Sequence, residues 1–309
     1  MKQEGYNRLR CARTGGISAD LLKLTAIITM LIDHIGAGIL ERLLIDGYVT
    51  DYALYLKIYQ LDSVLRIIGR ISFPIFCFLL VEGYLHTRSR RGYAFRLLAF
   101  ALLSEIPFDL LFSGGLNLLS QNVFWTLLIG LLVLWGMDGV REALRAHGGR
   151  TEPKDGRAAG REKGKPAEKA AGGREKRLRI LRSAAEAAGI LLVTAAGMCA
   201  AALLKTDYSW RGVLLIAVIG LLMRDRLLLV IDAPCAFLLT EFLVLLNNGQ
   251  SLQTCLETVL SHTTVFLSFA LIWFYNGKRR RRGHRYIFYL FYPVHLLILF
   301  FCRQILYAL

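Results

Sequence analysis

The chain has 309 residues, of which 55% are hydrophobic and 20% are charged, and its mean hydropathy is +0.46. Soluble domains carry roughly 45–50% apolar and about 25% charged residues. The net charge of +15 would suit a nucleic-acid-binding protein, but here the basic blocks alternate with apolar runs long enough to cross a bilayer. The composition therefore excludes an ordinary soluble domain or nucleic-acid-binding protein and predicts an all-α, polytopic transmembrane helical bundle.

Nine apolar segments follow one another along the chain. A helix that spans the bilayer needs about 20 mostly apolar residues. We expect spans at 17–40, 68–86, 93–113, 122–137, 183–204, 212–223, 227–246, 262–276 and 286–307. Because 212–223 and 262–276 are short, we expect these two to be tilted, extended into their flanks or partly re-entrant.

The positions of Lys and Arg predict the orientation. If the N-terminus is cytoplasmic, the inside segments hold 29 of these residues and the outside loops hold 5. The positive-inside rule favours this arrangement, so the N-terminus is predicted inside and the C-terminus outside. The chain then divides into a cytoplasmic tail (1–16), a four-helix membrane half (17–137), a basic cytoplasmic loop (138–182) and a five-helix membrane half (183–309).

The middle of the basic loop, residues 150–177, has no aromatic residue and no Leu, Ile or Val. A segment of this kind buries too little apolar surface to offset the entropy of ordering, so we expect it to be disordered. It is interpreted as a linker between the halves, or as a basic surface that attracts anionic lipid or an anionic donor such as acyl-CoA.

Cysteine and nucleotide-binding patterns give no sign of a cofactor. The six cysteines form no CxxC pair, and most fall inside the predicted helices, where they are expected to be small packing residues. The sequence has no P-loop, no dinucleotide fingerprint and no zinc-ligand spacing. No metal site is predicted.

Ionisable residues inside the apolar runs are the candidates for function, because each costs several kcal/mol at bilayer depth unless it is paired or hydrated. The first span carries Lys23 near its inner end and Asp33 and His34 deep in its outer half. A structural hydrogen bond is the simplest role for a lone histidine, but the adjacent carboxylate favours a functional site. Neighbours on a helix point about 100° apart, so Asp33 need not contact His34.

The second, third and fourth spans add further candidates. Arg70 lies at the outer end of the second span, and Glu82 near its inner end has either a functional role or pairs with a nearby arginine. Glu105 and Asp109 share one face of the third span, which requires a shared proton, a cation or water. Asn122 opens the fourth span at the same outer level.

The second half contributes one loop and one helix. The loop KTDYSWRG places Asp207 and Tyr208 at the outer surface, and the last span holds Tyr292 and His295 around a proline kink. Most of the buried polar residues map to the outer half, whereas Arg96 and neighbouring arginines map to the inner surface. A histidine with carboxylates acts as a general base, and a basic inner mouth suits a phosphate-bearing donor.

The chain resembles the TraX family in several motifs that follow one another in that family's order. They are DLLKLTAIITMLIDHIG (20–36), IGRISFPIFCFLLVEGYLHT (68–87), YAFRLLAFALLSEIPFDL (93–110), NVFWTLLIG (122–130), DYSWRGVLLI (207–216), YNGKR (275–279) and FYLFYPVHLLIL (288–299). TraX proteins are implicated in N-terminal acetylation of conjugative pilin and resemble membrane acyltransferases of the acyltransferase-3 type. That group has a basic residue, ten residues and then a histidine, which Lys23 and His34 match. The basic insertion 138–182 is not part of the family's core.

The resemblance implies a multi-pass acyltransferase of the bacterial inner membrane. It would transfer an acetyl group from acetyl-CoA to an amine or hydroxyl acceptor at the outer side, a pilin N-terminus or another surface polymer. His34 is the expected base, with Asp33, Glu105 or Asp109 orienting it, and the expected substrate-binding residues are Lys23, Arg70, Glu82, Arg96, Asn122, Asp207, Tyr208, Tyr292 and His295. Two alternatives remain: a transporter or lipid-handling protein with a proton relay, and a non-catalytic component of a conjugation or secretion apparatus.

Overall fold

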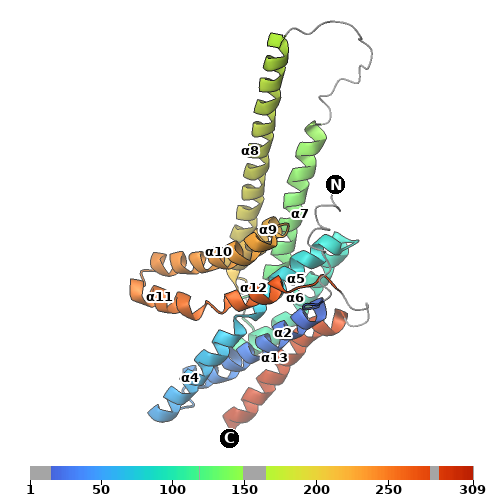
Figure 1. Cartoon of the computed structure of the whole chain (residues 1–309). Coiled ribbons are helices and arrows are strands. Elements are labelled where there is room, and N and C mark those ends of the chain that lie inside the picture. Colours follow the sequence, from blue (N-terminus) through green and yellow to red (C-terminus); the bar gives the residue numbers. More distant parts are fainter. Residues whose placement is uncertain (1–14, 118, 149–164, 279–284, 309) are drawn as a thin grey trace.

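The computed structural model describes residues 15–117, 119–148, 165–278 and 285–308, and these are almost wholly helical (Figure 1). The helices are α2 (Ala19–Ile35), the π-helix η1 (Gly36–Leu40), α3 (Glu41–Ile45), α4 (Tyr52–Gly69), α5 (Ser72–His86), α6 (Arg90–Ser113), α7 (Val123–Gly148), α8 (Lys165–Leu203), α9 (Ser209–Leu222), α10 (Arg226–Asn247), α11 (Leu252–Ser261), α12 (Val265–Trp273) and α13 (Arg285–Ala308). The polytopic helical bundle predicted from the sequence is confirmed. Most of the predicted tail 1–16 lies outside the described residues.

Seven stretches of the described chain are long and apolar enough to cross a membrane, rather than the predicted nine. They are Ala19–Ile45, Tyr52–His86, Val123–Ala146, Lys176–Leu203, Arg226–Asn247, Leu252–Trp273 and Ile287–Ala308. The difference lies in α9, which has only 14 residues, and α6, which carries Arg96, Glu105 and Asp109 among its apolar residues. With these two included, the path has the nine segments expected.

Two predicted outside loops are helical, which corrects the sequence interpretation. Residues 41–67 contain α3 and most of α4, and residues 247–261 contain α11. Helices α4 and α11 each have a side-chain N-cap: the N–H of Leu54 donates to Asp51, and the N–H of Thr254 donates to Ser251. Such caps satisfy backbone donors that the first helical turn leaves free. Charged and polar side chains had lowered the apparent hydrophobicity of these segments.

The predicted basic loop 138–182 is helical at both ends. Helix α7 continues to Gly148 and α8 begins at Lys165, so the two helices extend along each other beyond the rest of the bundle (Figure 1). Ala, Glu, Lys and Arg are strong helix formers, so a composition without a hydrophobic face still favours a helix here. The predicted disorder at 150–177 is therefore wrong for 165–177, which belong to α8, whereas 150–164 lie outside the described residues.

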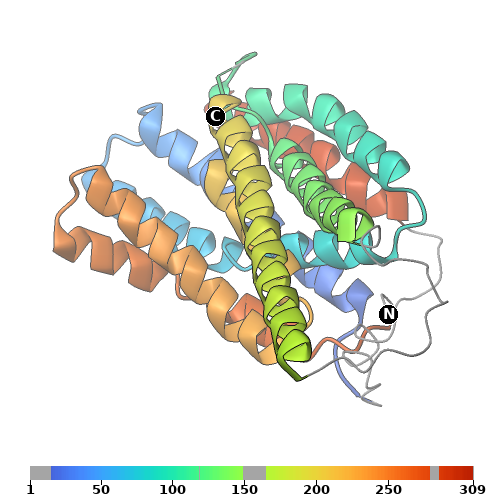
Figure 2. The same ribbon diagram turned by 90° about the horizontal axis from the view of Figure 1, so that it is seen from above.

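The two predicted halves form one bundle. Helix α7 packs against α8 and α9, α5 packs against α9 and α12, and α13 packs against α6 and α2. Seen from above, α7 and α8 lie side by side, with α6 and α13 on one side and the α10–α11 hairpin on the other (Figure 2). Residues from both halves therefore meet in the interior.

The first and last long helices run in the same direction. The N–H of Ile17 donates to the carbonyl of Phe274 at 2.9 Å, which ties the start of α2 to the segment before α13. At the other end, the Tyr307 hydroxyl donates to Asp46 at 2.5 Å, just beyond α3. The described ends of the chain thus lie at opposite ends of the bundle (Figure 1), and the N-terminus inside remains a prediction.

The second span is broken between α4 and α5. A proline ring clashes with the carbonyl four residues earlier, so Pro74 accounts for the end of α4 near Arg70. Carbonyls freed at the break accept hydrogen bonds from α12: Thr264 donates to Ile67 at 3.1 Å, and Ser268 donates to Ile71 at 2.9 Å. These backbone carbonyls at the break are thereby hydrogen-bonded within the protein, as the interior of a membrane requires.

Glycines let α2 and α4 approach closely. A Cβ added to Gly69 would lie 2.2 Å from the Cβ of Asp33, and one added to Gly36 would lie 2.7 Å from Oδ1 of Asp62. Small residues at such crossings are a common way for membrane helices to pack. Gly36 also opens the π-helix η1, an irregularity that is frequent at functional sites.

An arginine from α13 caps the end of α6. Arg303 is 1% exposed and donates to the carbonyls of Leu110, at 3.0 Å, and Leu111. Its Nη1 also lies 3.4 Å from the carbonyl of Gly38 in η1. The last four carbonyls of a helix lack intrahelical partners, so this buried cation holds three helices together at their outer ends.

We predict that Gly69→Ala separates α2 from α4 and lowers the melting temperature of the purified protein in detergent. The added methyl group overlaps the Asp33 side chain, and overpacking of this kind costs about 1–3 kcal/mol. Gly139→Ala is the matched control, because a Cβ there meets nothing within 4 Å and alanine favours the α7 helix. Equal or higher melting temperatures for both variants would contradict the proposed close contact.

Candidate functional site

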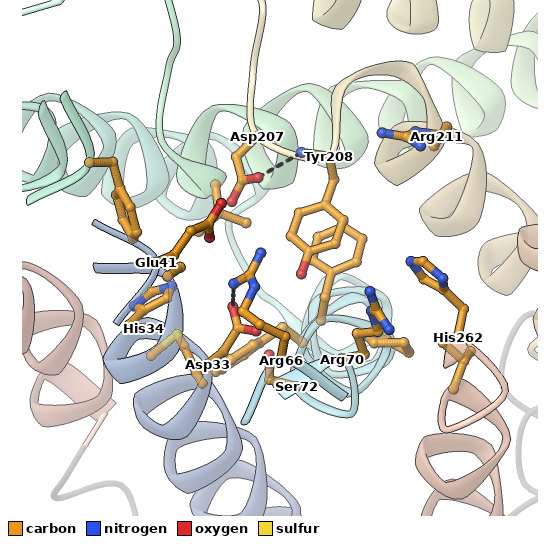
Figure 3. Close-up of a pocket in the computed structure, with 18 of the residues that line it drawn as sticks. Asp33, His34, Glu41, Arg66, Arg70, Ser72, Asp207, Tyr208, Arg211 and His262 are labelled. Atoms are coloured by element: carbon orange, nitrogen blue, oxygen red, sulfur yellow. Dashed lines mark hydrogen bonds and ion pairs between the residues drawn. The ribbon is translucent and has the colours of Figure 1, made fainter. Parts of the chain in front are cut away.

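A pocket of about 450 Å³ lies where the broken second span meets α2, and Figure 3 shows many of its side chains. Its polar lining includes Asp33 and His34 (α2), Glu41 and Arg42 (α3), Arg66 and Arg70 (α4 and its end), Ser72 (α5), Asp207 and Tyr208 (the loop before α9), Arg211 (α9), Glu241 (α10) and His262 (between α11 and α12). Aromatic residues including Phe73, Phe112 and Tyr292 fill the spaces between them. The size suits a small ligand or the end of a chain.

His34 is bonded to a second histidine from the last helix. Its Nδ1 lies 2.7 Å from Nε2 of His295, and the two rings are nearly parallel. His34 lines the pocket, whereas His295 lies behind it and is 4% exposed. The prediction that these two residues belong to one site thus agrees with the geometry, although His295 supports His34 and does not line the pocket.

The hydrogen bonds determine which ring nitrogens carry protons. Nδ1 of His295 lies 2.8 Å from the carbonyl of Phe291, and a carbonyl only accepts, so this nitrogen carries a proton. In the neutral ring Nε2 of His295 is then an acceptor, and His34 must donate to it from Nδ1. The remaining nitrogen of His34, Nε2, is left with a free lone pair. This is the arrangement of a base.

Asp33 does not orient His34. Its Oδ2 accepts from Nη1 of Arg66 at 2.7 Å, which joins α2 to α4 (Figure 3). The next arginine, Arg70, donates instead to the backbone and hydroxyl oxygens of Ser261, at 3.0 and 2.9 Å. The pocket wall is therefore built from arginines that each have a defined partner.

The loop before α9 carries Asp207 and Tyr208 into the pocket in a strained conformation. Lys205, Tyr208 and Ser209 all have positive φ, which costs non-glycine residues free energy and is concentrated at functional sites. The loop is held by a hydrogen bond from the N–H of Asp207 to the carbonyl of Gln121 and by stacking of Tyr208 on Phe73 at 3.6 Å. Burial raises the pKa of Asp207 from 3.8 to about 6, and the Asp33 carboxylate adds to the shift.

Three predicted residues of the outer half form a separate cluster. Glu105 accepts from the indole of Trp125 at 3.0 Å and from the amide of Asn122, which also donates to the carbonyl of Ala101 at 2.8 Å. Asp109 accepts from the N–H of Asn117 at 2.9 Å. The three do not line the pocket. They connect α6 with α7 and the loop between these helices.

The predicted residues of the inner half are also away from the pocket. Lys23 lies 3.5 Å from Asp20 and over the ring of Phe288, and Arg96 lies over the ring of Tyr93. Glu82 is buried and accepts from the hydroxyl of Tyr275 at 3.0 Å. Lys23 and His34 are eleven residues apart, roughly 16 Å along the helix.

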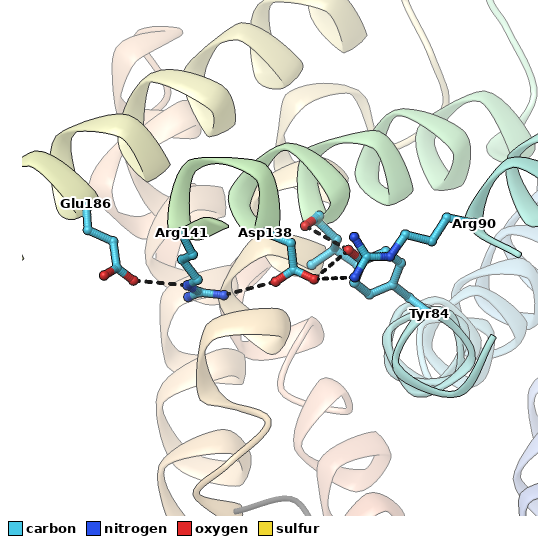
Figure 4. A network of polar contacts seen from close by, with 6 residues as sticks. Tyr84, Arg90, Asp138, Arg141 and Glu186 are labelled. Atoms are coloured by element: carbon cyan, nitrogen blue, oxygen red, sulfur yellow. Dashed lines mark hydrogen bonds and ion pairs between the residues drawn. The ribbon is translucent and has the colours of Figure 1, made fainter. Parts of the chain in front are cut away.

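A polar network ties α5, α6, α7 and α8 together on the inner side (Figure 4). Asp138 accepts from Tyr84 at 2.9 Å and from Arg90 at 2.6 Å. Arg141 bridges Asp138 and Glu186. Part of the predicted basic inner face is thus neutralised by partners in the chain, while its residues 279–282 lie outside the described residues.

Sequence reasoning missed six charged or histidine residues that line the pocket. Glu41, Arg42 and Arg66 fell in a predicted loop, Arg211 and His262 lay at or just beyond the ends of predicted spans, and Glu241 lay inside one. Glu241 and Arg211 form an ion pair of 2.6 Å across α9 and α10. The available signal was Glu241 itself, an ionisable residue inside an apolar run.

Comparisons with known proteins agree with these motifs. A model of the family described as TraX protein matches residues 18–147 and 174–303, which leaves out most of the basic insertion. The chain is 28% identical over 300 residues to a probable fimbrial assembly protein FimC, serogroup H1, of Dichelobacter nodosus, covering 93% of this chain and 96% of that protein. No solved structure matches the chain.

We predict that Asp207→Asn raises the melting temperature at pH 7.5 and that the gain shrinks at pH 4.5. The Asp207 carboxyl has a pKa of about 6 in the folded protein and an ordinary value of 3.8 in the unfolded chain. Between these pH values the folded protein holds a proton that the unfolded chain has released, so the free energy of unfolding falls as the pH rises through 6. The uncharged amide avoids this cost, which is at most about 3 kcal/mol for a rise in pKa of this size. Asp51→Asn, at an exposed N-cap that asparagine also serves, is the control. A lower melting temperature at pH 7.5 would show that the ionised form stabilises the fold.

Proposed function

Because this chain belongs to the TraX family, we propose that it is a membrane acyltransferase that moves an acetyl group from acetyl-CoA to an amine acceptor at the outer side of the bacterial inner membrane. The observation that carries the proposal is the free Nε2 of His34, in a pocket that also holds ionisable side chains. The geometry supports a base with a fixed orientation, which a packing histidine would not need.

The pocket suits acceptor binding from the outer side. Its lining extends through Glu41, Arg42 and Ile45, on the turn of α3 farthest from the start of α2. Leu22 and Ala26, nearer the start of α2, are fully buried and do not line the pocket. An acceptor with an amino group would therefore approach His34 past α3.

The proposed reaction needs one proton acceptor in the pocket. As the acceptor amine attacks the thioester carbonyl carbon, Nε2 of His34 takes a proton from the nitrogen. The carbon–nitrogen bond forms, the carbon–sulfur bond breaks, and the CoA thiolate leaves and takes the proton from Nε2 of His34. The products are an acetamide and free CoA thiol, and His295 keeps Nδ1 of His34 occupied throughout.

The comparison with the fimbrial assembly protein supports a surface polymer as the acceptor. We propose that this acceptor is the amino terminus of a pilin subunit or of another exported polypeptide. Such an end would be presented at the outer face, while the phosphates of the donor stay on the cytoplasmic side, where Arg88, Arg91 and Arg96 place positive charge, and its thioester end reaches His34.

We predict that His34→Gln lowers the rate of acetyl transfer by about 10²–10⁴-fold, because loss of a general base has effects of this size. The assay uses purified protein in nanodiscs, radiolabelled acetyl-CoA and a peptide with a free amino terminus. A peptide with a formylated amino terminus measures background transfer.

Asp225→Asn is the control variant, because it keeps the N-cap of α10 and lies away from the pocket. It should retain full transfer. If folded His34→Gln transfers acetyl groups as fast as the parent protein, His34 is not the base. If the parent protein transfers none, the acyltransferase proposal is wrong.

His295 is proposed as a positioning residue, and its variants test the hydrogen-bond argument. His295→Leu removes the acceptor for Nδ1 of His34, so kcat should fall about tenfold with little change in the KM for the peptide. His295→Gln keeps a side-chain oxygen that can accept, and should recover most of kcat. Equal losses in the two variants would mean that His295 serves only packing.

A further inference from the structure

The charges that line the pocket do not all cancel within the protein. Three arginines have carboxylate partners: Arg66 with Asp33 at 2.7 Å, Arg211 with Glu241 at 2.6 Å, and Arg42 with Asp46 at 3.2 Å. Among the described residues, no ion pair forms at three other lining residues, namely Glu41, Asp207 and Arg70. These three charges are therefore available to pair with charged groups of a ligand.

The unpaired charges lie on two sides of the pocket. In Figure 3, Glu41 and Asp207 are on the side of His34, whereas Arg70 lies beside His262 on the other side, with Tyr208 between them. Asp207 is bonded through only one oxygen, Oδ1, to the N–H of Tyr208 at 3.0 Å. One side is therefore suited to a cation and the other to an anion.

Arg70 is held in place but is not saturated. Within the described part of the chain only its Nη1 is bonded, to the two oxygens of Ser261, and a guanidinium has five N–H donors. Nδ1 of His262 is directed at the carbonyl of Thr258 at 2.7 Å, which leaves Nε2 for another contact. A carboxylate could be bound here with two or more hydrogen bonds, as arginine commonly does.

The pocket also has an apolar lining. Phe73, Phe76, Phe237 and Val265 contribute to it, and the ring of Phe73 stacks on that of Tyr208. Such a surface accommodates hydrocarbon side chains, which a zwitterionic lipid headgroup lacks. The lining thus favours the end of a polypeptide over a headgroup.

From this arrangement we infer that the pocket binds the amino-terminal segment of a polypeptide that also carries an acidic side chain a few residues from its amino group. The ammonium group lies at Glu41 and Asp207, beside Nε2 of His34, and the acidic side chain lies on Arg70. The inference deepens the proposed function by naming what the acceptor must contain, but the binding itself requires no acetyl transfer.

The test measures peptide binding in nanodiscs by fluorescence anisotropy, without acetyl-CoA. The probes are short apolar peptides with a C-terminal fluorophore and a single Glu placed at each of the first few positions in turn, each matched by a Gln peptide. For the best position, the parent protein should bind the Glu peptide about tenfold more tightly than its Gln partner. In Arg70→Gln this preference should vanish, and in Arg70→Lys it should be partly kept.

Lys57→Gln is the matched control, because it removes one positive charge from an exposed position of the same helix, outside the pocket. It should leave the Glu preference unchanged. The role of the amino group is tested by comparing peptides with free and acetylated amino termini. The acetylated peptides should bind the parent protein about tenfold more weakly. In the double variant Glu41→Gln/Asp207→Asn, the free and acetylated peptides should bind equally.

A Glu preference that persists in folded Arg70→Gln, or that is absent at every position in the parent protein, overturns the inference. The inference is also overturned if glycerophosphoethanolamine displaces the bound peptides and the Glu and Gln peptides bind with equal affinity. That result would identify a site for a lipid headgroup. Binding that follows the prediction without any acetyl transfer would contradict the proposed function alone, so the two failures are distinguishable.

Discussion

The close approach of α2 to α4 is the contact on which the rest of the site depends. Gly36 and Gly69 let the two helices meet, and the ion pair between Asp33 and Arg66 closes the contact. Since successive residues on a helix point about 100° apart, fixing Asp33 toward α4 turns His34 toward α13 and His295. One helix thereby connects the arginines of the second span to the histidine of the last.

Irregular backbone around this contact is satisfied by side chains from distant parts of the chain. The break before α5 receives hydroxyl donors from α12, and Arg303 of α13 donates to carbonyls at the end of α6. Because a membrane interior offers little water to unpaired backbone groups, each irregularity needs such a partner. The pocket is consequently a product of the whole bundle, and neither of the two predicted halves contains it alone.

The sequence was sufficient to predict the helical bundle, the path of the chain and the depth of most polar residues. Depth placed Asp33, His34, Arg70 and Asp207 at one level, and all four line the pocket. Depth does not say which way a side chain points around its helix, so Glu105 was grouped with them although it faces Trp125. Hydropathy also failed to predict helix α4, because charged residues that line the pocket, such as Arg66, lowered the hydropathy of that segment and made it resemble a loop.

The pairing of His34 with His295, and not with the adjacent Asp33, is consistent with separate tasks for the buried groups. A carboxylate bonded to His34 would favour its protonated, charged form. A neutral histidine that accepts from Nδ1 leaves His34 uncharged, with Nε2 ready to accept a proton. In the proposed reaction, Glu41 and Asp207 then attract the acceptor as an ammonium ion, which loses one proton to water before it attacks, and His34 takes the second proton during the attack. Carboxylates that hold the acceptor and a histidine that reacts with it need different neighbours, and the crossing of α2, α4 and α13 supplies both.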